Sequence, residues 1–197
     1  MQKTVELYYD FSSPNAYFAA MTLPAIAARV GARVVYRPFF LGGLFKLLGA
    51  PQTPGMSSPE KAAASLKDLE RWSKKHGVPF RFPSRFPMNT LAALRVALLL
   101  GDLGLEPRGW VEAAFRAYWV EDRDISDEAV LRELLTGLGQ DADAVLEKSR
   151  APEVKDALRA ATEAARARGI FGAPVCAVGD ELFFGKDRLD FVEDGLR

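Results

Sequence analysis

The residues whose types and spacing could support catalysis or binding lie in three short segments, at 10–17, 169–175 and 184–189. In the first segment, Ser13 stands directly before Pro14, a pair that is typical of the start of a helix. Free backbone N–H groups and the helix dipole favour a negative charge at that position, so Ser13 could stabilise an anion there. The same hydroxyl could serve only as a helix cap, a role worth about 1 kcal/mol. The two roles are compatible.

The other two segments contain a proline and a charged pair. Pro174 follows Ala173 in a Gly-Ala-Pro-Val stretch. Local sequence alone favours a trans peptide bond there, because only about 5–6% of X-Pro bonds in folded proteins are cis. Asp187 and Arg188 stand at the start of the last expected helix. In the simplest interpretation the helix dipole favours the aspartate and the arginine is solvated.

Several kinds of site are excluded by residue counts. Cys176 is the only cysteine, so the chain cannot run a two-cysteine redox cycle by itself. Its apolar context predicts an inert core thiol. His76, the only histidine, lies at the expected end of a helix, which argues against a Ser-His-Asp triad and against a His/Cys metal site. We therefore expect no metal, and no phosphate-binding glycine loop is present in the sequence.

Composition predicts the setting in which the protein works. The chain has 26 Lys and Arg against 26 Asp and Glu, so its net charge gives no attraction to nucleic acid or to an anionic membrane. Residues 1–9 lack the apolar run of a signal peptide, and the apolar stretch at 94–100 is too short to span a bilayer. We expect a cytoplasmic protein with neither of these partners.

The elements expected at the two ends of the chain are strands with flanking helices. A strand at 5–9, a helix from 14 to about 30 and a strand at 33–37 form a β-α-β unit, which favours a parallel strand pair. Strands at 175–178 and 181–184 flank a hairpin turn, and a final helix follows. Residues 39–59, rich in glycine and proline, are expected to be irregular.

A helical region is expected between these ends, because apolar residues recur there with helical spacing. The expected helices lie at 58–76, 91–100, 107–119, from 126, at 142–149 and at 153–168. The resulting fold class is α/β, with an all-helical insertion between a β-α-β half and a β-β-α half. We predict one domain formed by 1–57 and 169–197, and a second domain formed by 58–168.

Five segments, in this order, resemble the thioredoxin superfamily in its DsbA-like branch, which carries a helical insertion. The resemblance extends to kappa-class glutathione transferases and is greatest to the 2-hydroxychromene-2-carboxylate isomerase family. It covers nearly the whole chain and implies a thioredoxin fold. The segments are DFSSPNAY at 10–17, LGGLFK at 41–46, FPMNTLAALR at 86–95, FGAP at 171–174 and GKDRL at 185–189.

The resemblance assigns a role to the first segment and to the proline. Redox relatives carry cysteines at the positions of Ser13 and Ala16, and both sulfurs are missing here. The resemblance implies that Ser13 donates a hydrogen bond to the thiolate of bound glutathione and lowers its pKa. It also implies a cis bond between Ala173 and Pro174, with the Ala173 backbone pairing with the cysteinyl part of glutathione.

The resemblance also suggests where the charged ends of the ligands bind. Lys61 resembles the lysine that binds the glycyl carboxylate, although it could be a plain exposed lysine. Lys46 is a second cation for glutathione or for a substrate carboxylate, and Ala50 replaces an asparagine that relatives often carry. For Asp187 and Arg188, the implied alternative is binding of the γ-glutamyl ammonium and the adjacent carboxylate. Asn89 could cap its helix or contact substrate.

The activity implied by the resemblance is a glutathione-dependent isomerisation of an aromatic carboxylate, by a protein that is a homodimer. Ser13 would be the catalytic residue, and glutathione the cofactor that supplies the nucleophile. One alternative is a kappa-like glutathione transferase or peroxidase that uses the same site. Another is a non-catalytic thioredoxin-fold binding module. Tyr118, Trp119 and Phe40 are expected in the core rather than against substrate.

Overall fold

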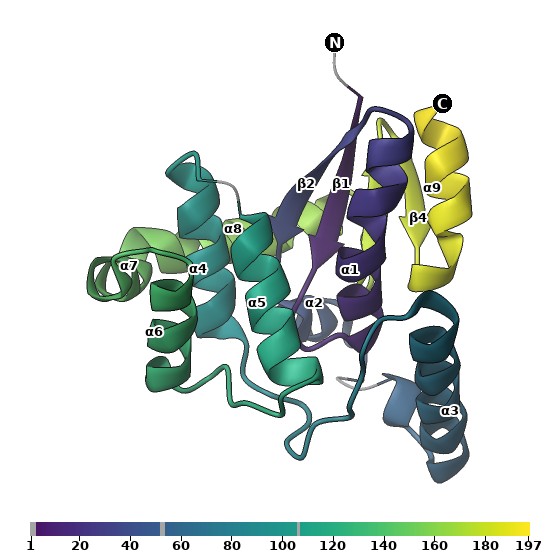
Figure 1. Cartoon of the computed structure of the whole chain (residues 1–197), viewed down its shortest axis with the longest axis horizontal. Helices are drawn as coiled ribbons and strands as arrows, with labels where there is room; N and C mark the ends of the chain where they lie inside the picture. The colour runs from purple at the N-terminus through teal and green to yellow at the C-terminus, as the bar shows by residue number, and fades with distance from the viewer. Residues whose placement is uncertain (1–2, 52–53, 106) are drawn as a thin grey trace.

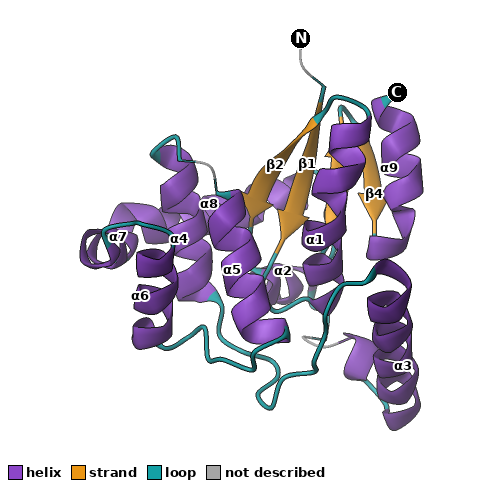
Figure 2. Ribbon diagram, in the orientation of Figure 1, coloured by secondary structure: helices purple, strands orange, loops and turns teal. Residues whose placement is uncertain are grey.

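The centre of the computed structural model, which describes residues 3–51, 54–105 and 107–197, is a mixed sheet in the order β2-β1-β3-β4. Strand β1 runs parallel to β2, β3 runs antiparallel to β1, and β4 runs antiparallel to β3. This confirms the expected parallel pair and the C-terminal hairpin (Figure 2). The strands are β1 (Thr4–Tyr9), β2 (Arg33–Pro38), β3 (Val175–Val178) and β4 (Glu181–Phe184).

One face of this sheet is covered by two helices that lie side by side. Helix α1 (Pro14–Arg29) packs against β1 and β2, and α9 (Leu189–Leu196) packs against β1, β3 and β4 (Figure 1). Strand β1 alternates between buried and partly buried residues, as a half-covered strand should. The end of β1 and the start of α1 therefore lie together at one edge of the sheet and the helix layer that covers it.

The region at 39–59 is not irregular as predicted, because it contains helix α2 (Leu41–Leu48). Two glycines near its start allow the ring of Phe40 to pack on the backbone: a Cβ atom at Gly42 or at Gly43 would lie 2.9 Å from that ring. Gly49 ends the helix in the left-handed conformation, at φ +64°. The rest of the prediction falls partly on residues 52–53, which lie outside the described residues.

The expected helices between the two β-rich ends are all present, and they do not form one compact group. Helix α3 buries only Leu69 and packs against α1 and the short helix η1 (Pro54–Met56), away from α4, α6 and α7 (Figure 1). The helices are α3 (Pro59–His76), α4 (Leu91–Asp102), α5 (Arg108–Trp119), α6 (Glu128–Gly137), α7 (Ala142–Ser149) and α8 (Pro152–Ala167).

Helices α4, α5 and α8 join this region to the sheet. Both α4 and α8 pack against β2, and α5 packs against α1. Tyr118 and Trp119 on α5 are fully buried, which confirms that they belong to the core. The indole Nε1 of Trp119 donates to the Phe11 carbonyl at 2.8 Å, directly beside the start of α1. The division into two domains stays a prediction, and no described helix is long and apolar enough to cross a membrane.

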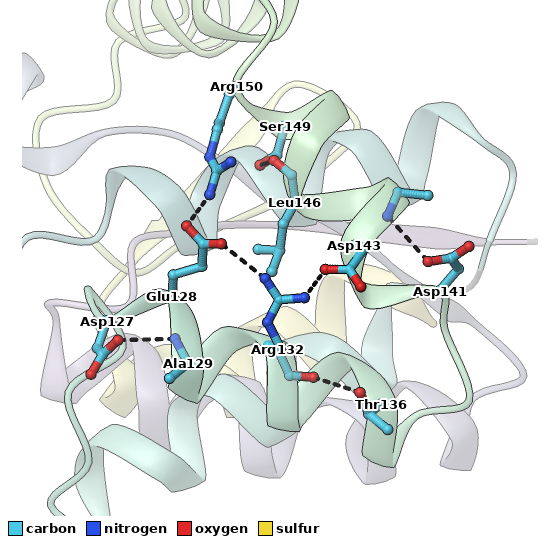
Figure 3. A network of polar contacts seen from close by, with 11 residues as sticks. Asp127, Glu128, Ala129, Arg132, Thr136, Asp141, Asp143, Leu146, Ser149 and Arg150 are labelled. Atoms are coloured by element: carbon cyan, nitrogen blue, oxygen red, sulfur yellow. Dashed lines mark hydrogen bonds and ion pairs between the residues drawn. The ribbon is translucent and has the colours of Figure 1, made fainter.

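Helices α6 and α7 are connected by an exposed ion-pair network. The Arg132 guanidinium pairs with Glu128 at 3.0 Å on its own helix and with Asp143 on α7 (Figure 3). Glu128 also pairs with Arg150, just after α7. Asp141 caps α7 through the Ala144 N–H group at 3.1 Å. The network lies at the exposed surface between two peripheral helices, apart from the cavity described below.

Candidate active site

The three segments singled out in the sequence meet at a cavity of about 500 Å³, a volume typical of small-molecule sites. We call it the serine cavity. Its lining is mostly apolar. It includes Phe82 and Phe86, from the long connection after α3, and Phe184, at the end of β4. The other lining residues are Ser12, Ser13, Pro14, Asn15, Leu41, Phe45, Gly55, Met56, Ser65, Leu66, Asp68, Leu69, Pro87, Phe171, Gly172, Ala173 and Lys186.

Ser13 occupies the N-cap of α1 and also lines this cavity. Its Oγ accepts from the Ala16 N–H at 3.2 Å and donates to the Ala173 carbonyl at 2.9 Å. Extended backbone at Ser13, with Pro14 in the first turn, places the hydroxyl over the free N–H groups of the helix. Capping and a position facing the cavity thus coexist in one side chain, which is 5% exposed.

The Ala173–Pro174 peptide bond is cis, as the sequence resemblance implies. Ala173 is buried and lines the serine cavity, beside Ser13. The Pro174 carbonyl accepts from the Gly185 N–H at 3.0 Å, which joins the start of β3 to the end of β4. The pairing of the Ala173 backbone with a bound ligand stays a prediction.

Two charged residues in the serine cavity were missed by the sequence analysis. The Lys186 ammonium pairs with a carboxylate oxygen of Asp68 at 2.6 Å and lies 4.8 Å from the centre of the Trp72 ring. The Lys186 side chain is only 8% exposed, whereas that of Asp68 is half exposed. The pair joins α3 to the segment before α9, and no local pattern relates two residues that are 118 positions apart.

The charged residues that the sequence did suggest lie outside the lining of the serine cavity. Asp187 and Arg188, in a short 3-10 turn before α9, pair with each other at 2.6 Å, and both side chains are about half exposed. Lys61 is exposed in the first turn of α3, where its backbone N–H donates to Ser58. The structure does not bring these three side chains into the cavity with Ser13, and their ligand-binding roles stay predictions.

A second cavity, of about 550 Å³, adjoins the first and shares Ser12, Leu41 and Pro87 with it. Lys46 on α2 and Asn89 before α4 both line this second cavity. Phe40, expected in the core, is partly buried and lines the second cavity as well. The Asn89 side-chain oxygen accepts from the Leu91 N–H at 3.1 Å, which is a capping contact. Capping does not prevent Asn89 from also meeting a ligand, and the roles of Lys46 and Asn89 stay predictions.

A buried carboxylate holds the loops around both cavities in place. Asp10, with no exposed surface, accepts hydrogen bonds from the Ser12 N–H at 2.9 Å, the Leu41 N–H at 2.7 Å and the Thr90 hydroxyl at 2.7 Å. Burial raises the pKa of Asp10, and these hydrogen bonds oppose that shift. The sequence analysis assigned no role to Asp10, because its partners come from three separate segments.

The other potentially reactive side chains are not placed to react. Cys176 is buried in β3, and burial raises the pKa of its thiol to about 12. His76 stacks on Trp72 with ring centres 4.3 Å apart, and partial burial together with nearby Lys75 lowers its pKa. Among the residues that the structure describes, no group of three His, Cys, Asp or Glu side chains could hold a metal ion.

Comparison with known proteins relates this geometry to a family. A family model described as a DSBA-like thioredoxin domain matches residues 4–197. A 2-hydroxychromene-2-carboxylate isomerase from Sphingobium xenophagum is 35% identical over 196 residues, covering 100% of this chain and 99% of that protein. Glutathione S-transferase kappa 1 from Homo sapiens is 27% identical over 208 residues, covering 98% and 90%.

Solved structures agree with the sequence matches. A solved structure of a selenomethionine 2-hydroxychromene-2-carboxylate isomerase (HCCA isomerase) aligns with a TM-score of 0.89 at 26% identity, covering 98% of this chain and 94% of that one. The match extends over both β-rich ends and the helices between them. The chain therefore belongs to the DSBA-like thioredoxin domain family and, within it, to the family of the 2-hydroxychromene-2-carboxylate isomerases.

Proposed function

We propose that this protein is a glutathione-dependent isomerase that acts on an aromatic carboxylate of the 2-hydroxychromene-2-carboxylate type. The observation that carries the proposal is the position of Ser13 at the N-terminus of α1, in a mostly apolar cavity and in contact with Ala173. Full-length similarity to proteins named as this isomerase supports the reaction class. Glutathione is supported by a relative named as a kappa glutathione transferase.

The serine cavity fits a peptide-like thiol in both size and chemistry. Its volume of about 500 Å³ suits a small molecule, and its lining offers a hydroxyl, a buried backbone segment and one charge of each sign. When bound, glutathione would supply the thiol nucleophile that the chain itself lacks. Cys176 cannot take that role, because it is buried in β3 with a strongly raised pKa.

Ser13 would act on the sulfur of that thiol. Its hydroxyl hydrogen now points to the Ala173 carbonyl, and a thiolate in the cavity would offer it a charged acceptor. The hydroxyl oxygen already accepts the Ala16 N–H, so the helix holds Ser13 in one orientation. A hydrogen bond to a charged group is worth about 1.5–3 kcal/mol, which corresponds to a thiol pKa lowered by about one to two units.

The second cavity would receive the substrate. Its lining combines the Lys46 ammonium, the Asn89 amide and the ring of Phe40, which suits an aromatic ring with a carboxylate. Because the two cavities share Ser12, Leu41 and Pro87, a thiol in one would face a substrate in the other. Ser13 and Asn15 remain on the side of the serine cavity.

The decisive experiment combines calorimetric titration of glutathione with ultraviolet detection of its thiolate as a function of pH. We expect binding, and we expect Ser13→Ala to raise the pKa of the bound thiol by about one to two units while weakening binding less. The matched control is Ser58→Ala, which removes the equivalent Ser-Pro cap from α3. No binding to the unaltered protein at millimolar glutathione would refute the proposal.

A kappa-like transferase is the second candidate, because it would use the same thiol site with a different electrophile. The human kappa relative supports this option over the full length of the chain. The two reactions differ in their product, since an isomerase returns glutathione unchanged and a transferase consumes it in a conjugate. Counting free thiol after turnover therefore separates them. The resemblance also suggests a cytoplasmic homodimer, which light scattering and cell fractionation would test.

A further inference from the structure

We propose that a small oxyanion of the phosphate or sulfate class binds between helices α4, α6 and α7, in a cavity of about 100 Å³ that we call the arginine cavity. Its polar lining residues are Arg95, Ser126, Glu128, Ser149 and Arg150. Among the described residues, none that lines the arginine cavity also lines the serine cavity or the second cavity. The inference therefore goes beyond the proposed function and does not depend on it.

The Arg95 guanidinium is the charge in this lining that lacks a counterion. Its Nε–H group is buried and has no hydrogen-bond acceptor among the residues that the structure describes. A buried polar group without a partner is rare and costly, and the cost is greater when the group belongs to a charged side chain. An anion in the cavity that Arg95 lines would place acceptor oxygens and a negative charge beside this guanidinium.

The carboxylate in the same lining is already engaged with other arginines. Glu128 pairs with Arg132 through one oxygen at 3.0 Å and with Arg150 through the other (Figure 3). Among the described residues, no ion pair joins Glu128 to Arg95. The lining thus carries two cations and one anion, and one further negative charge would balance it.

Arg150 supplies a second guanidinium to the cavity. It uses a terminal nitrogen for Glu128, and a guanidinium has five N–H donors in a planar fork, so further donors remain. The oxygens of a phosphate or sulfate group accept charge-assisted hydrogen bonds from such forks. Both serine hydroxyls of the lining already donate to protein acceptors, so the two guanidiniums are the donors that an anion would meet.

The volume of the arginine cavity limits the size of the ligand. A water molecule needs about 10–15 Å³ of such space, so a cavity of about 100 Å³ accommodates a group of a few heavy atoms. An inorganic oxyanion meets this limit, whereas glutathione or a nucleotide exceeds it. Water alone would satisfy the N–H group of Arg95 without balancing its charge, which favours an anion.

The test is isothermal titration calorimetry with inorganic phosphate, with sodium chloride adjusted to keep the ionic strength constant. The unaltered protein should bind phosphate at a saturable site, and its Tm should rise with phosphate until that site is filled. Arg95→Met should weaken phosphate binding about tenfold or more. Arg95→Lys keeps the charge and loses the planar fork, so its affinity should lie between these two. Sulfate should compete with phosphate for the site.

Two further variants separate anion binding from a general change in charge or packing. Arg159→Met, exposed on α8 and outside this lining, should bind phosphate as the unaltered protein does. Glu128→Gln removes the carboxylate from the lining and should tighten phosphate binding, because it removes a like charge from the anion's surroundings. The Glu128 side chain is about half exposed, so this variant tests the site even if circular dichroism shows that Arg95→Met does not fold.

Three results would overturn the inference. They are no phosphate binding by the unaltered protein at tens of millimolar, phosphate binding that Arg95→Met leaves intact, and weaker phosphate binding by Glu128→Gln. None of these results bears on glutathione binding, so the proposed function would stand or fall separately.

Discussion

The Ser13 hydroxyl donates a hydrogen bond to the Ala173 carbonyl at 2.9 Å, and this single contact joins the start of α1 to the segment before β3 across 160 positions of sequence. The same oxygen accepts from Ala16 within α1. One side chain thus supports the helix, links the two β-rich ends of the chain and faces the cavity. These three functions can be separated by experiment.

Replacing Ser13 by alanine should destabilise the protein more than replacing Ser58. Both serines cap a helix that begins with proline, but the Ser13 hydroxyl also reaches Ala173, whereas among the described residues the Ser58 hydroxyl contacts Glu60 and Lys61 of its own helix. We expect Ser58→Ala to lower the free energy of unfolding by about 1 kcal/mol or less, and Ser13→Ala by about 1–3 kcal/mol, because the buried Ala173 carbonyl loses its partner. Urea unfolding followed by circular dichroism gives both values. Equal losses would mean that the contact with Ala173 contributes nothing to stability.

Replacing Asp10 by asparagine should destabilise the loops around both cavities. An asparagine amide replaces one of the two acceptor oxygens of Asp10 with an N–H₂ donor. That donor would face other donors, either the Leu41 N–H or both the Ser12 N–H and the Thr90 hydroxyl. We expect a loss of about 1–3 kcal/mol in urea unfolding, against about 1 kcal/mol for Thr90→Val. A smaller loss for Asp10→Asn than for Thr90→Val would contradict the role of Asp10 as the common acceptor.

The pH dependence of that loss has a defined sign. Because the pKa of Asp10 is raised by burial, the folded state keeps a proton that the unfolded state has released above about pH 4. The free energy of unfolding contributed by Asp10 therefore falls as pH rises from there through the raised pKa. The stability advantage of the unaltered protein over Asp10→Asn should be larger at the acidic end of this window, and an advantage that grows with pH would contradict the assignment.

Replacing Lys46 by methionine should separate the two cavities functionally. Lys46 lines the second cavity and not the serine cavity, so its loss should weaken binding of a substrate carboxylate and leave glutathione affinity unchanged. We expect KM for the chromene carboxylate to rise about tenfold, as for loss of one charged hydrogen bond. Lys148→Met, on the distant helix α7, is the control. A parallel loss of glutathione affinity would place the thiol, rather than the substrate, against Lys46.

Replacing Arg132 by methionine should cost little despite the number of its partners. Arg132 contacts Glu128 and Asp143 in an exposed network (Figure 3), where solvent screens each pair. We expect a change of less than about 1 kcal/mol in the free energy of unfolding, smaller still in high salt. Thermal unfolding at two salt concentrations would measure it. A large, salt-independent loss would show that the network holds α6 and α7 together.

Much of the fold was predictable because its signals are local. The Ser13-Pro14 pair marks the start of α1 in sequence as it does in the structure, and the turn at Gly179 and Asp180 marks the hairpin. Helix α2 was missed because adjacent glycines argue against a helix on propensity alone. Its stability comes from tertiary contacts, namely the Phe40 ring against those glycines and the Asp10 carboxylate at the Leu41 N–H.

The site was predictable only where a single residue type constrains the local backbone conformation. Ser13 was found because a helix start is visible in sequence, Ala173 was found through the family resemblance, and the two are in contact in the structure. Lys186 was passed over in favour of its neighbours Asp187 and Arg188, which are the more exposed residues. What distinguishes Lys186 is burial against Trp72 and Asp68, and burial by a distant helix leaves no mark on the local pattern.

The burial of Cys176 has a practical consequence for anyone who measures this protein. With the chain's single sulfhydryl enclosed in β3, the folded protein contributes almost no background to Ellman titration or alkylation at neutral pH. Every reactive sulfur counted in such an assay belongs to the added small molecule. A reporter cysteine could therefore be introduced at a surface position without first removing the native one.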